Sequence, residues 1–233
     1  MGKTHDEQFY EQYAKVKDLN VKAYDRIRKE IHSGCTEKEL YEKVVDTYLS
    51  RTDGKATYTG DYISGLRTCD IEGPASDKVI ERGDTIIVDA LCEVDGVHCD
   101  TTRSFFCGGP NEEQKKAYFT LCKLLEEGKE LLRPGTVAGD IYRYVDRRLK
   151  EEGYESGLVH HAGHGLGDSW CEDPHFIAES ETVLEENMLV ALEPGIYIAG
   201  KFGLRVENNY RVTKDGGVDV FGYTTRLEDF IIA

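Results

Sequence analysis

Two acidic residues, Asp89 and Asp100, interrupt an otherwise apolar stretch of this sequence. The stretch, residues 84–107, reads DTIIVDALCEVDGVHCDTTRSFFC and predicts a β-hairpin that turns at Asp95-Gly96. With that turn, the two carboxylates lie on one face of the hairpin as diagonal neighbours. The hairpin places no Lys or Arg beside them, and adjacent carboxylates in an apolar setting are costly without positive charge. A divalent cation would balance them, whereas a solvent-facing sheet with two harmless acids is the alternative.

Three more candidate ligands follow along the chain. His164 lies within HHAGHGLGDSWCEDPH, residues 160–175, where glycines on both sides leave its ring unobstructed. A lone histidine is more often structural, but four histidines gather in this segment. Glu193 ends an apolar strand, and Glu207 sits in another strand after a Gly-rich turn. Four carboxylates and one imidazole can hold two divalent ions about 3.5–4 Å apart, which share a hydroxide and polarise a carbonyl.

The rest of the pattern predicts the elements that must position these residues. Apolar positions at helical spacing predict a long helix over residues 6–32. Thr36 and Glu39 form a capping box that opens a second helix ending near Leu49. Residues 51–107 are typical of strands and turns. Two further helices are expected over 111–132 and over about 138–152, because Pro134-Gly135-Thr136 separates them.

The two helical stretches resemble each other. A shift of 101 positions superimposes three pairs of residues: Gly34 on Gly135, Leu40 on Ile141, and Val44 on Val145. We therefore expect one domain, 1–233, built from duplicated halves of about 1–110 and 111–233, with the site between them. The alternative is that any two amphipathic helix pairs align this well.

Composition excludes several classes of protein. The 233 residues include 44 acidic and 29 basic side chains, a formal charge of −15 without a basic run, which argues against nucleic acid as a partner. No apolar stretch is long enough to span a membrane, and the polar N-terminus is not a secretory signal. Seven cysteines without a CxxC motif are typical of reduced thiols in a cytoplasmic protein.

The ordered set Asp, Asp, His, Glu, Glu resembles that of the pita-bread metallopeptidases, which include methionine aminopeptidase, prolidase, aminopeptidase P and creatinase. The matching motifs are SDKVIERGDTIIVDA, HCDTTRSF, GHGLG, EPGIY and GLRVEN. EPGIY and the G-x-R-x-E pattern are similar to the prolidase and aminopeptidase P branch. The resemblance implies an α+β pita-bread fold, with pseudo-twofold halves and a curved antiparallel sheet flanked by helices. It also implies a chain without the N-terminal domain of creatinase-type relatives.

The resemblance assigns a role to each of the five ligands. Asp89 would hold one metal ion, and His164 and Glu193 the other, while Asp100 and Glu207 would bridge the pair. Glu193 would also accept the proton of the bridging water. The resemblance implies two divalent ions, such as manganese, cobalt or iron, and the sequence does not determine which metal binds.

Further catalytic residues are carried over with two departures. His160 matches a substrate-pocket histidine of the prolidase branch, and Arg205 would support the site electrostatically. Glu72 and Cys171 stand where prolidase-type enzymes carry histidines that contact the scissile amide. Glu72 could still donate a proton.

Other side chains near the departures are candidates for the substrate pocket. Asp168 and Trp170 flank Cys171, and Trp170 could stack on a planar or cationic substrate. His175 or His98 could also reach the pocket.

The residues are compatible with three functions. The first is a metal-dependent hydrolase resembling Xaa-Pro peptidases, in which a metal-bridging hydroxide attacks an amide. The second is a creatinase-like C–N hydrolase or lyase acting on a small metabolite, because Glu72 and Cys171 alter the peptide-binding shell. The third is a non-catalytic interaction module, which the intact ligand set disfavours. The oligomeric state stays open, with a homodimer as one option.

Overall fold

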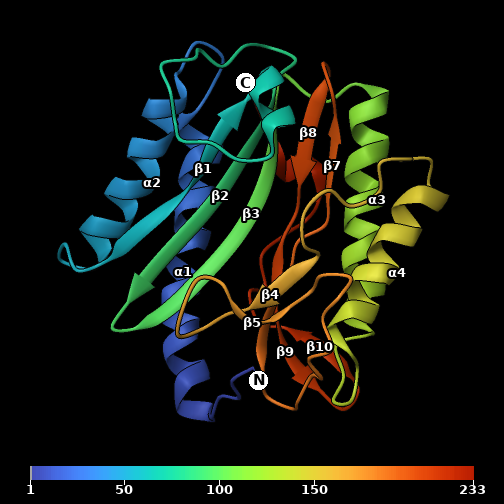
Figure 1. Cartoon of the computed structure of the whole chain (residues 1–233). Coiled ribbons are helices and arrows are strands. Elements are labelled where there is room, and N and C mark those ends of the chain that lie inside the picture. Colours follow the sequence, from blue (N-terminus) through green and yellow to red (C-terminus); the bar gives the residue numbers. More distant parts are fainter. Residues whose placement is uncertain (1) are drawn as a thin grey trace.

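The predicted hairpin is present in the computed structural model, which describes residues 2–233. Strands β2 (Thr85–Val94) and β3 (Val97–Cys107) pair antiparallel around Asp95-Gly96, where both residues have positive φ, 53° and 82°. The register places Asp89 opposite Thr102 and Leu91 opposite Asp100, which confirms the predicted pairing. Strand β1 (Thr57–Ser64) extends the sheet beside β2, and β11 (Ile231–Ile232) runs parallel to β3 (Figure 1).

The second half of the chain contributes shorter strands. A five-stranded sheet has the order β10-β9-β6-β4-β5, and β7 and β8 form a separate hairpin. Their bounds are β4 Gly163–Gly165, β5 Glu172–His175, β6 Leu189–Leu192, β7 Gly195–Ile198, β8 Phe202–Arg205, β9 Asn208–Thr213 and β10 Gly216–Asp219. In Figure 1 these strands lie beside the β2–β3 hairpin, so residues from both halves of the chain meet along one seam.

Four helices flank the strands and match the predicted ranges closely. They are α1 (Glu7–Glu30), α2 (Glu37–Arg51), α3 (Glu112–Lys129) and α4 (Ala138–Glu151), with short 3-10 turns at Gly65–Asp70 and Leu227–Phe230. The capping box of Thr36 and Glu39 is present. Helices α1 and α2 lie on one side of the molecule, and α3 and α4 lie on the other (Figure 1).

The two helix pairs are anchored by the same backbone hydrogen bonds. Gly34 and Gly135 both have positive φ, 98° and 92°, at the turn between the two helices of each pair. Three backbone N–H to C=O hydrogen bonds recur in both halves. In the first half they run from Gly34 to Ile80, from Ile80 to Cys35 and from Glu37 to Lys78. In the second half the corresponding bonds run from Gly135 to Leu184, from Leu184 to Thr136 and from Ala138 to Thr182. This repetition supports duplicated halves, while their boundary near residue 110 remains a prediction.

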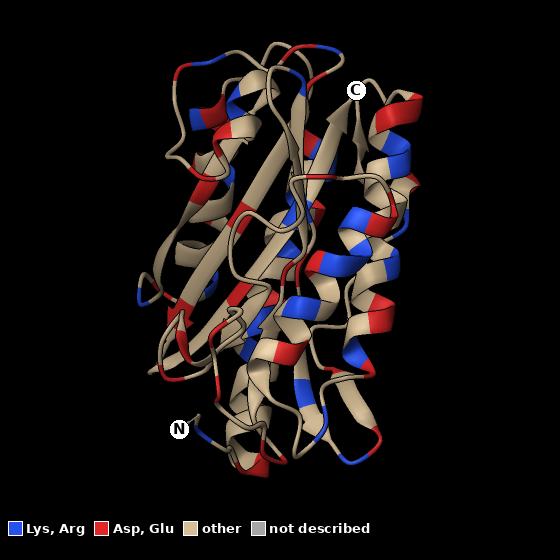
Figure 2. Ribbon diagram, turned by 45° about the vertical axis from the view of Figure 1, so that its right-hand side comes forward, with Lys and Arg blue, Asp and Glu red and all other residues tan. Residues whose placement is uncertain are grey.

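Charged side chains concentrate on the outer helical surface. Figure 2 shows acidic and basic residues alternating along α3 and α4. Arg148 contacts Glu127 and Glu151 there at 3.0 and 2.6 Å, so many of the acids pair with basic neighbours in solvent. Acidic residues also lie within the strands, and Asp100 on β3 is buried there, with 7% of its surface exposed. Among residues 2–233, no helix has the length and apolar character needed to cross a membrane.

Candidate metal centre

The five proposed ligands come from five places in the fold that meet at the seam between the halves. Asp89 lies on β2, Asp100 on β3 and His164 on β4, Glu193 directly follows β6, and Glu207 lies between β8 and β9. A cavity of about 500 Å³ opens above them, and all except Glu207 line it. Glu207 lies beneath the cavity floor with 1% of its surface exposed. The structure therefore brings the whole predicted set together.

The glycines around His164 are required by close packing of the neighbouring strands. Strand β4 lies between β5 and β6, with His164 opposite His175 on one side and Ala191 on the other. A Cβ atom at Gly163 would lie 2.1 Å from the Ala191 carbonyl oxygen, and one at Gly165 would lie 2.2 Å from the Asp173 carbonyl oxygen. The GHGLG motif thus lets three backbones approach closely enough to bury the imidazole among the acids.

His164 presents one ring nitrogen to the carboxylates. Its Nδ1 lies 2.9 Å from the Gly165 carbonyl oxygen, so Nδ1 donates and Nε2 faces the acids. Nε2 is 3.3 Å from Glu193 Oε1 and 3.8 Å from Asp100 Oδ2. Ligand atoms of Asp100, His164 and Glu207 all lie within 4.8 Å of one another. A backbone carbonyl that fixes the tautomer is the usual second partner of a metal-binding histidine.

The acids at the floor of the cavity lack enough partners. Across the described residues, Asp100 Oδ1 and Glu207 Oε1 are buried without a hydrogen bond. Burial and neighbouring acids, Glu207 first, raise the pKa of Asp100 well above its usual range. Burial and the charge of Glu193 raise the pKa of Glu207 in the same way. Crowded, unsatisfied oxygen ligands beside an imidazole fit hard divalent cations, which would remove the repulsion.

Glu193 and His164 act on each other. Burial opposes ionisation of Glu193, but the contact with His164 and the nearby His161 and His160 outweigh it and lower the pKa to about 2. Burial likewise opposes the charged form of His164, and Glu193 reverses this and raises the pKa to about 9. The pair therefore favours a protonated imidazole beside an ionised carboxylate, and a bound cation would replace that proton, since metal ions bind deprotonated ligands.

Arg205 compensates Asp89 from a distant part of the chain. Its Nη2 donates to Asp89 Oδ2 at 2.8 Å, and Thr102 Oγ1 donates to Asp89 Oδ1 at 2.7 Å. The prediction from the hairpin sequence that no basic residue lies near this face is therefore wrong for Asp89, because Arg205 reaches it from β8. Arg205 also reaches Asp61 Oδ2 at 3.4 Å and the Tyr197 hydroxyl at 3.2 Å. Among the salt bridges of residues 2–233, Asp100 has no Lys or Arg partner, and its neighbour there is His164 Nε2 at 3.8 Å.

Three other predicted site residues line the cavity wall: His160, Glu72 and Cys171. His160 Nδ1 lies 2.7 Å from the His161 carbonyl oxygen, and its Nε2 lies 3.1 Å from the Tyr197 hydroxyl. Burial lowers the pKa of His160 to about 4, so its ring is neutral near pH 7. Burial, helped by Glu193, raises the pKa of the Cys171 thiol to about 11, which argues against a nucleophilic thiolate.

Asp168 and Trp170 do not lie where the sequence placed them, because neither lines this cavity. Asp168 pairs with Lys3 at the surface, with 47% of its side chain exposed. Trp170 packs edge-on against His98, with ring centroids 4.9 Å apart. His175 is not a lining residue either, but it contacts Cys171. Asp168 and Trp170 thus have their partners outside this cavity, while Cys171 lines it.

Sequence reasoning missed Asp61, His161 and Tyr197. Asp61 lies on β1 directly opposite Asp89, and burial together with Asp89 raises its pKa to about 6. An acid inside a predicted strand was the signal that could have found it. His161 Nε2 lies 3.1 Å from Glu193 Oε1. The signal for His161 was its place beside His160, and the signal for Tyr197 was its place at the end of the EPGIY motif.

The chain belongs to metallopeptidase family M24, whose model matches residues 11–214. Peptidases of this family use divalent metals. The Xaa-Pro dipeptidase of Pyrococcus furiosus is 34% identical over 204 residues, which cover 87% of this chain and 58% of that protein. The chain therefore spans less than two thirds of such relatives.

Solved structures show the same architecture. The Xaa-Pro dipeptidase of Bacillus anthracis matches with a TM-score of 0.92 at 27% identity, over 98% of this chain and 64% of that one. The prolidase of Pyrococcus horikoshii matches with a TM-score of 0.89 at 31% identity, over 96% of this chain and 65% of that one. The fold is thus the α+β pita-bread fold expected from the motifs.

Proposed function

We propose that this protein is a dinuclear-metal-dependent hydrolase that cleaves the amide bond of small Xaa-Pro peptides. The observation that carries the proposal is the buried group of Asp100, His164, Glu193 and Glu207 beneath an open cavity, with acid oxygens left unpartnered. A cavity of about 500 Å³ suits a dipeptide or tripeptide. The names of the relatives, Xaa-Pro dipeptidase and prolidase, support the substrate class.

The chain's own residues would divide the chemistry as follows. When bound, two divalent ions such as manganese, cobalt or iron would supply Lewis acidity and lower the pKa of water. Asp89, Asp100, His164, Glu193 and Glu207 would hold the pair. Glu193 would accept the proton from the attacking water, because its carboxylate lines the cavity beside the other proposed ligands.

The cavity wall would orient the substrate. Arg205 donates to the Tyr197 hydroxyl, which lies against His160 Nε2, so these groups form a fixed polar wall. Glu72 lines the same cavity and would be the candidate donor of a proton to the leaving nitrogen. The seven free cysteines favour a reducing compartment such as the cytoplasm.

Xaa-Pro cleavage is the direct test. We expect the protein, loaded with manganese, cobalt or iron, to release proline from Xaa-Pro dipeptides, measured by amino-acid analysis. A matched Xaa-Ala series should react more slowly if the wall recognises proline. Absence of proline release with all three metals, from folded and metal-loaded protein, would contradict the proposal.

The second candidate is a C–N hydrolase or lyase for a small non-peptidic metabolite. It is favoured by Glu72 and Cys171, which put a carboxylate and a thiol in the cavity wall. A variant with both residues changed to His separates the two candidates. Peptidase activity that rises from nothing in this variant would favour the metabolite, and efficient peptide cleavage by the unmodified protein would exclude it.

Metal removal should lower thermal stability. Each cation that binds only the folded state adds about 2.7 kcal/mol at a concentration a hundred times Kd, so one ion alone raises Tm by roughly 5–10 °C for a chain of this size, and two ions raise it by more. We expect manganese added to chelator-treated protein to produce such a rise in scanning calorimetry, with two ions bound per chain by elemental analysis.

Asp100→Asn should abolish most of that rise, and Asp215→Asn, in the exposed turn before β10, should leave it intact. A stoichiometry near zero with every metal would point to the non-catalytic interaction module instead.

A further inference from the structure

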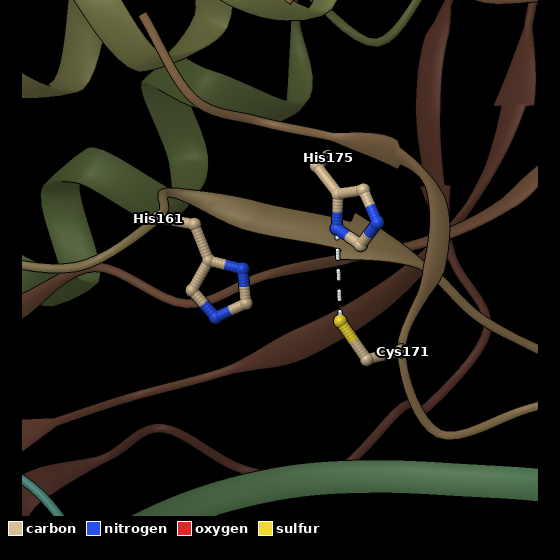
Figure 3. A group of neighbouring side chains, drawn as sticks. All are labelled: His161, Cys171 and His175. Atoms are coloured by element: carbon tan, nitrogen blue, oxygen red, sulfur yellow. Dashed lines mark hydrogen bonds between the residues drawn. The ribbon is translucent and has the colours of Figure 1, made fainter.

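Three side chains at the rim of the cavity form a cluster that the proposed metal pair does not use. His161 precedes β4, Cys171 precedes β5, and His175 ends β5. Figure 3 shows the three side chains converging, with a ring nitrogen of each histidine turned toward the sulfur. One ligand atom from each residue lies within 4.8 Å of the others.

The separations are close to those of a coordinated ion. Cys171 Sγ lies 3.7 Å from His175 Nδ1. A tetrahedral zinc ion, with Zn–S of about 2.3 Å and Zn–N of about 2.0 Å, holds its ligand atoms roughly 3.5 Å apart. Since all three ligand atoms lie within 4.8 Å of one another, side-chain rotation would bring them to coordination distance. Cys171 is exposed and the two histidines are half-buried, so an ion can enter from solvent and the side chains can adjust.

Each histidine also has a carboxylate beside its other end. His161 Nε2 lies 3.1 Å from Glu193 Oε1, and His175 Nε2 lies 4.0 Å from Asp173 Oδ1. Electrostatic attraction to a nearby carboxylate favours the proton on the ring nitrogen that faces it, which leaves the other nitrogen to bind a metal. The Nε2 atom of His161 faces Glu193, which leaves Nδ1 for the space beside Cys171, and the Nδ1 atom of His175 already faces the sulfur at 3.7 Å.

We propose that His161, Cys171 and His175 form a third metal site, which binds a zinc-class divalent cation through two nitrogens and a thiolate. The donor chemistry separates it from the floor of the cavity, where four carboxylates and one imidazole suit harder ions. Binding releases the thiol proton to solvent, since a coordinating thiol is deprotonated outright. With three protein ligands, the cation keeps one position for water or for a substrate group. His161 and Cys171 line the cavity, so the bound ion would form part of its wall.

Cobalt absorption tests the site independently of catalysis. The reduced, chelator-treated chain is titrated with Co²⁺, and the near-ultraviolet thiolate-to-cobalt charge-transfer band is followed. The ligands at the cavity floor contain no sulfur, so this band reports the rim cluster alone. We expect one equivalent of thiolate-bound cobalt per chain, and loss of the band when Zn²⁺ is added in competition.

Variants identify the ligands. Cys171→Ser should remove the band, and His175→Ala should weaken cobalt binding, while both surface positions tolerate the change without unfolding. Cys35→Ser is the matched control, because Cys35 belongs to none of the candidate metal groups of residues 2–233, and it should leave the band unchanged. The proposal is overturned if the folded protein shows no band, or if the band survives in Cys171→Ser. Neither result bears on the proposed Xaa-Pro cleavage, which is tested by proline release, so the two proposals fail separately.

Discussion

Replacement of Glu193 by Gln is expected to lower kcat/KM for Xaa-Pro substrates by at least about a thousandfold. Gln preserves the shape of the side chain but cannot carry the negative charge or accept a proton from water. Glu193 is also the acid nearest His164 Nε2, at 3.3 Å, so one metal ligand is weakened by the same change. Steady-state kinetics of proline release measures the loss, and elemental analysis separates lost chemistry from lost metal.

The matched control is Glu186→Gln. Glu186 lies in the turn before β6, has 45% of its side chain exposed and approaches Lys214 at 3.7 Å. The same change of charge there should alter kcat/KM by no more than about twofold, since exposed pairs contribute little. Retention of a tenth or more of the activity by Glu193→Gln would remove Glu193 from the proposed mechanism.

Replacement of Arg205 by Met should lower the free energy of unfolding of the metal-free protein by about 3–5 kcal/mol. Met fills most of the space of the Arg stem, so the main loss is the buried charge. Arg205 is 4% exposed and donates to Asp89 at 2.8 Å. Asp61, whose pKa burial and Asp89 already raise to about 6, loses its cation as well. Urea denaturation in the presence of chelator measures the change.

Two comparisons separate the charge effect from packing. Asp61→Asn added to Arg205→Met removes one of the uncompensated carboxylates and should restore part of the loss. Arg133→Met tests an exposed pair, because Arg133 and Glu130 are 49% and 57% exposed, and it should cost less than about 1 kcal/mol. A loss below 1 kcal/mol for Arg205→Met would show that Asp61 and Asp89 do not depend on this charge.

Local chemistry explains what could be predicted from the sequence. The Asp95-Gly96 turn sets the register of the hairpin, and the register alone puts Asp89 and Asp100 on one face. The helix ends follow in the same way from caps within a few residues of each end. The glycines around His164 are also visible locally, although the reason for them, contact with Ala191 and Asp173 on neighbouring strands, is not.

Contacts between distant segments explain what could not be predicted. Arg205 meets Asp89 only because β8 packs near β2, and no local pattern encodes that distance. Asp168 and Trp170 are neighbours of Cys171 in sequence, yet Lys3 and His98 hold them away from the cavity. Side-chain direction in an irregular loop depends on such partners, whereas in a strand it follows from alternation.

The seam between the halves has a consequence for the order of folding events. Asp89 and Asp100 belong to the first hairpin, while His164, Glu193 and Glu207 belong to the later strands. The full set of proposed ligands exists only after the two halves have docked. Metal ions held by all five ligands would therefore not stabilise the folding steps that precede docking. They would act mainly by slowing the separation of the halves during unfolding. Bound metal would then set the lifetime of the native state more than the speed at which it forms.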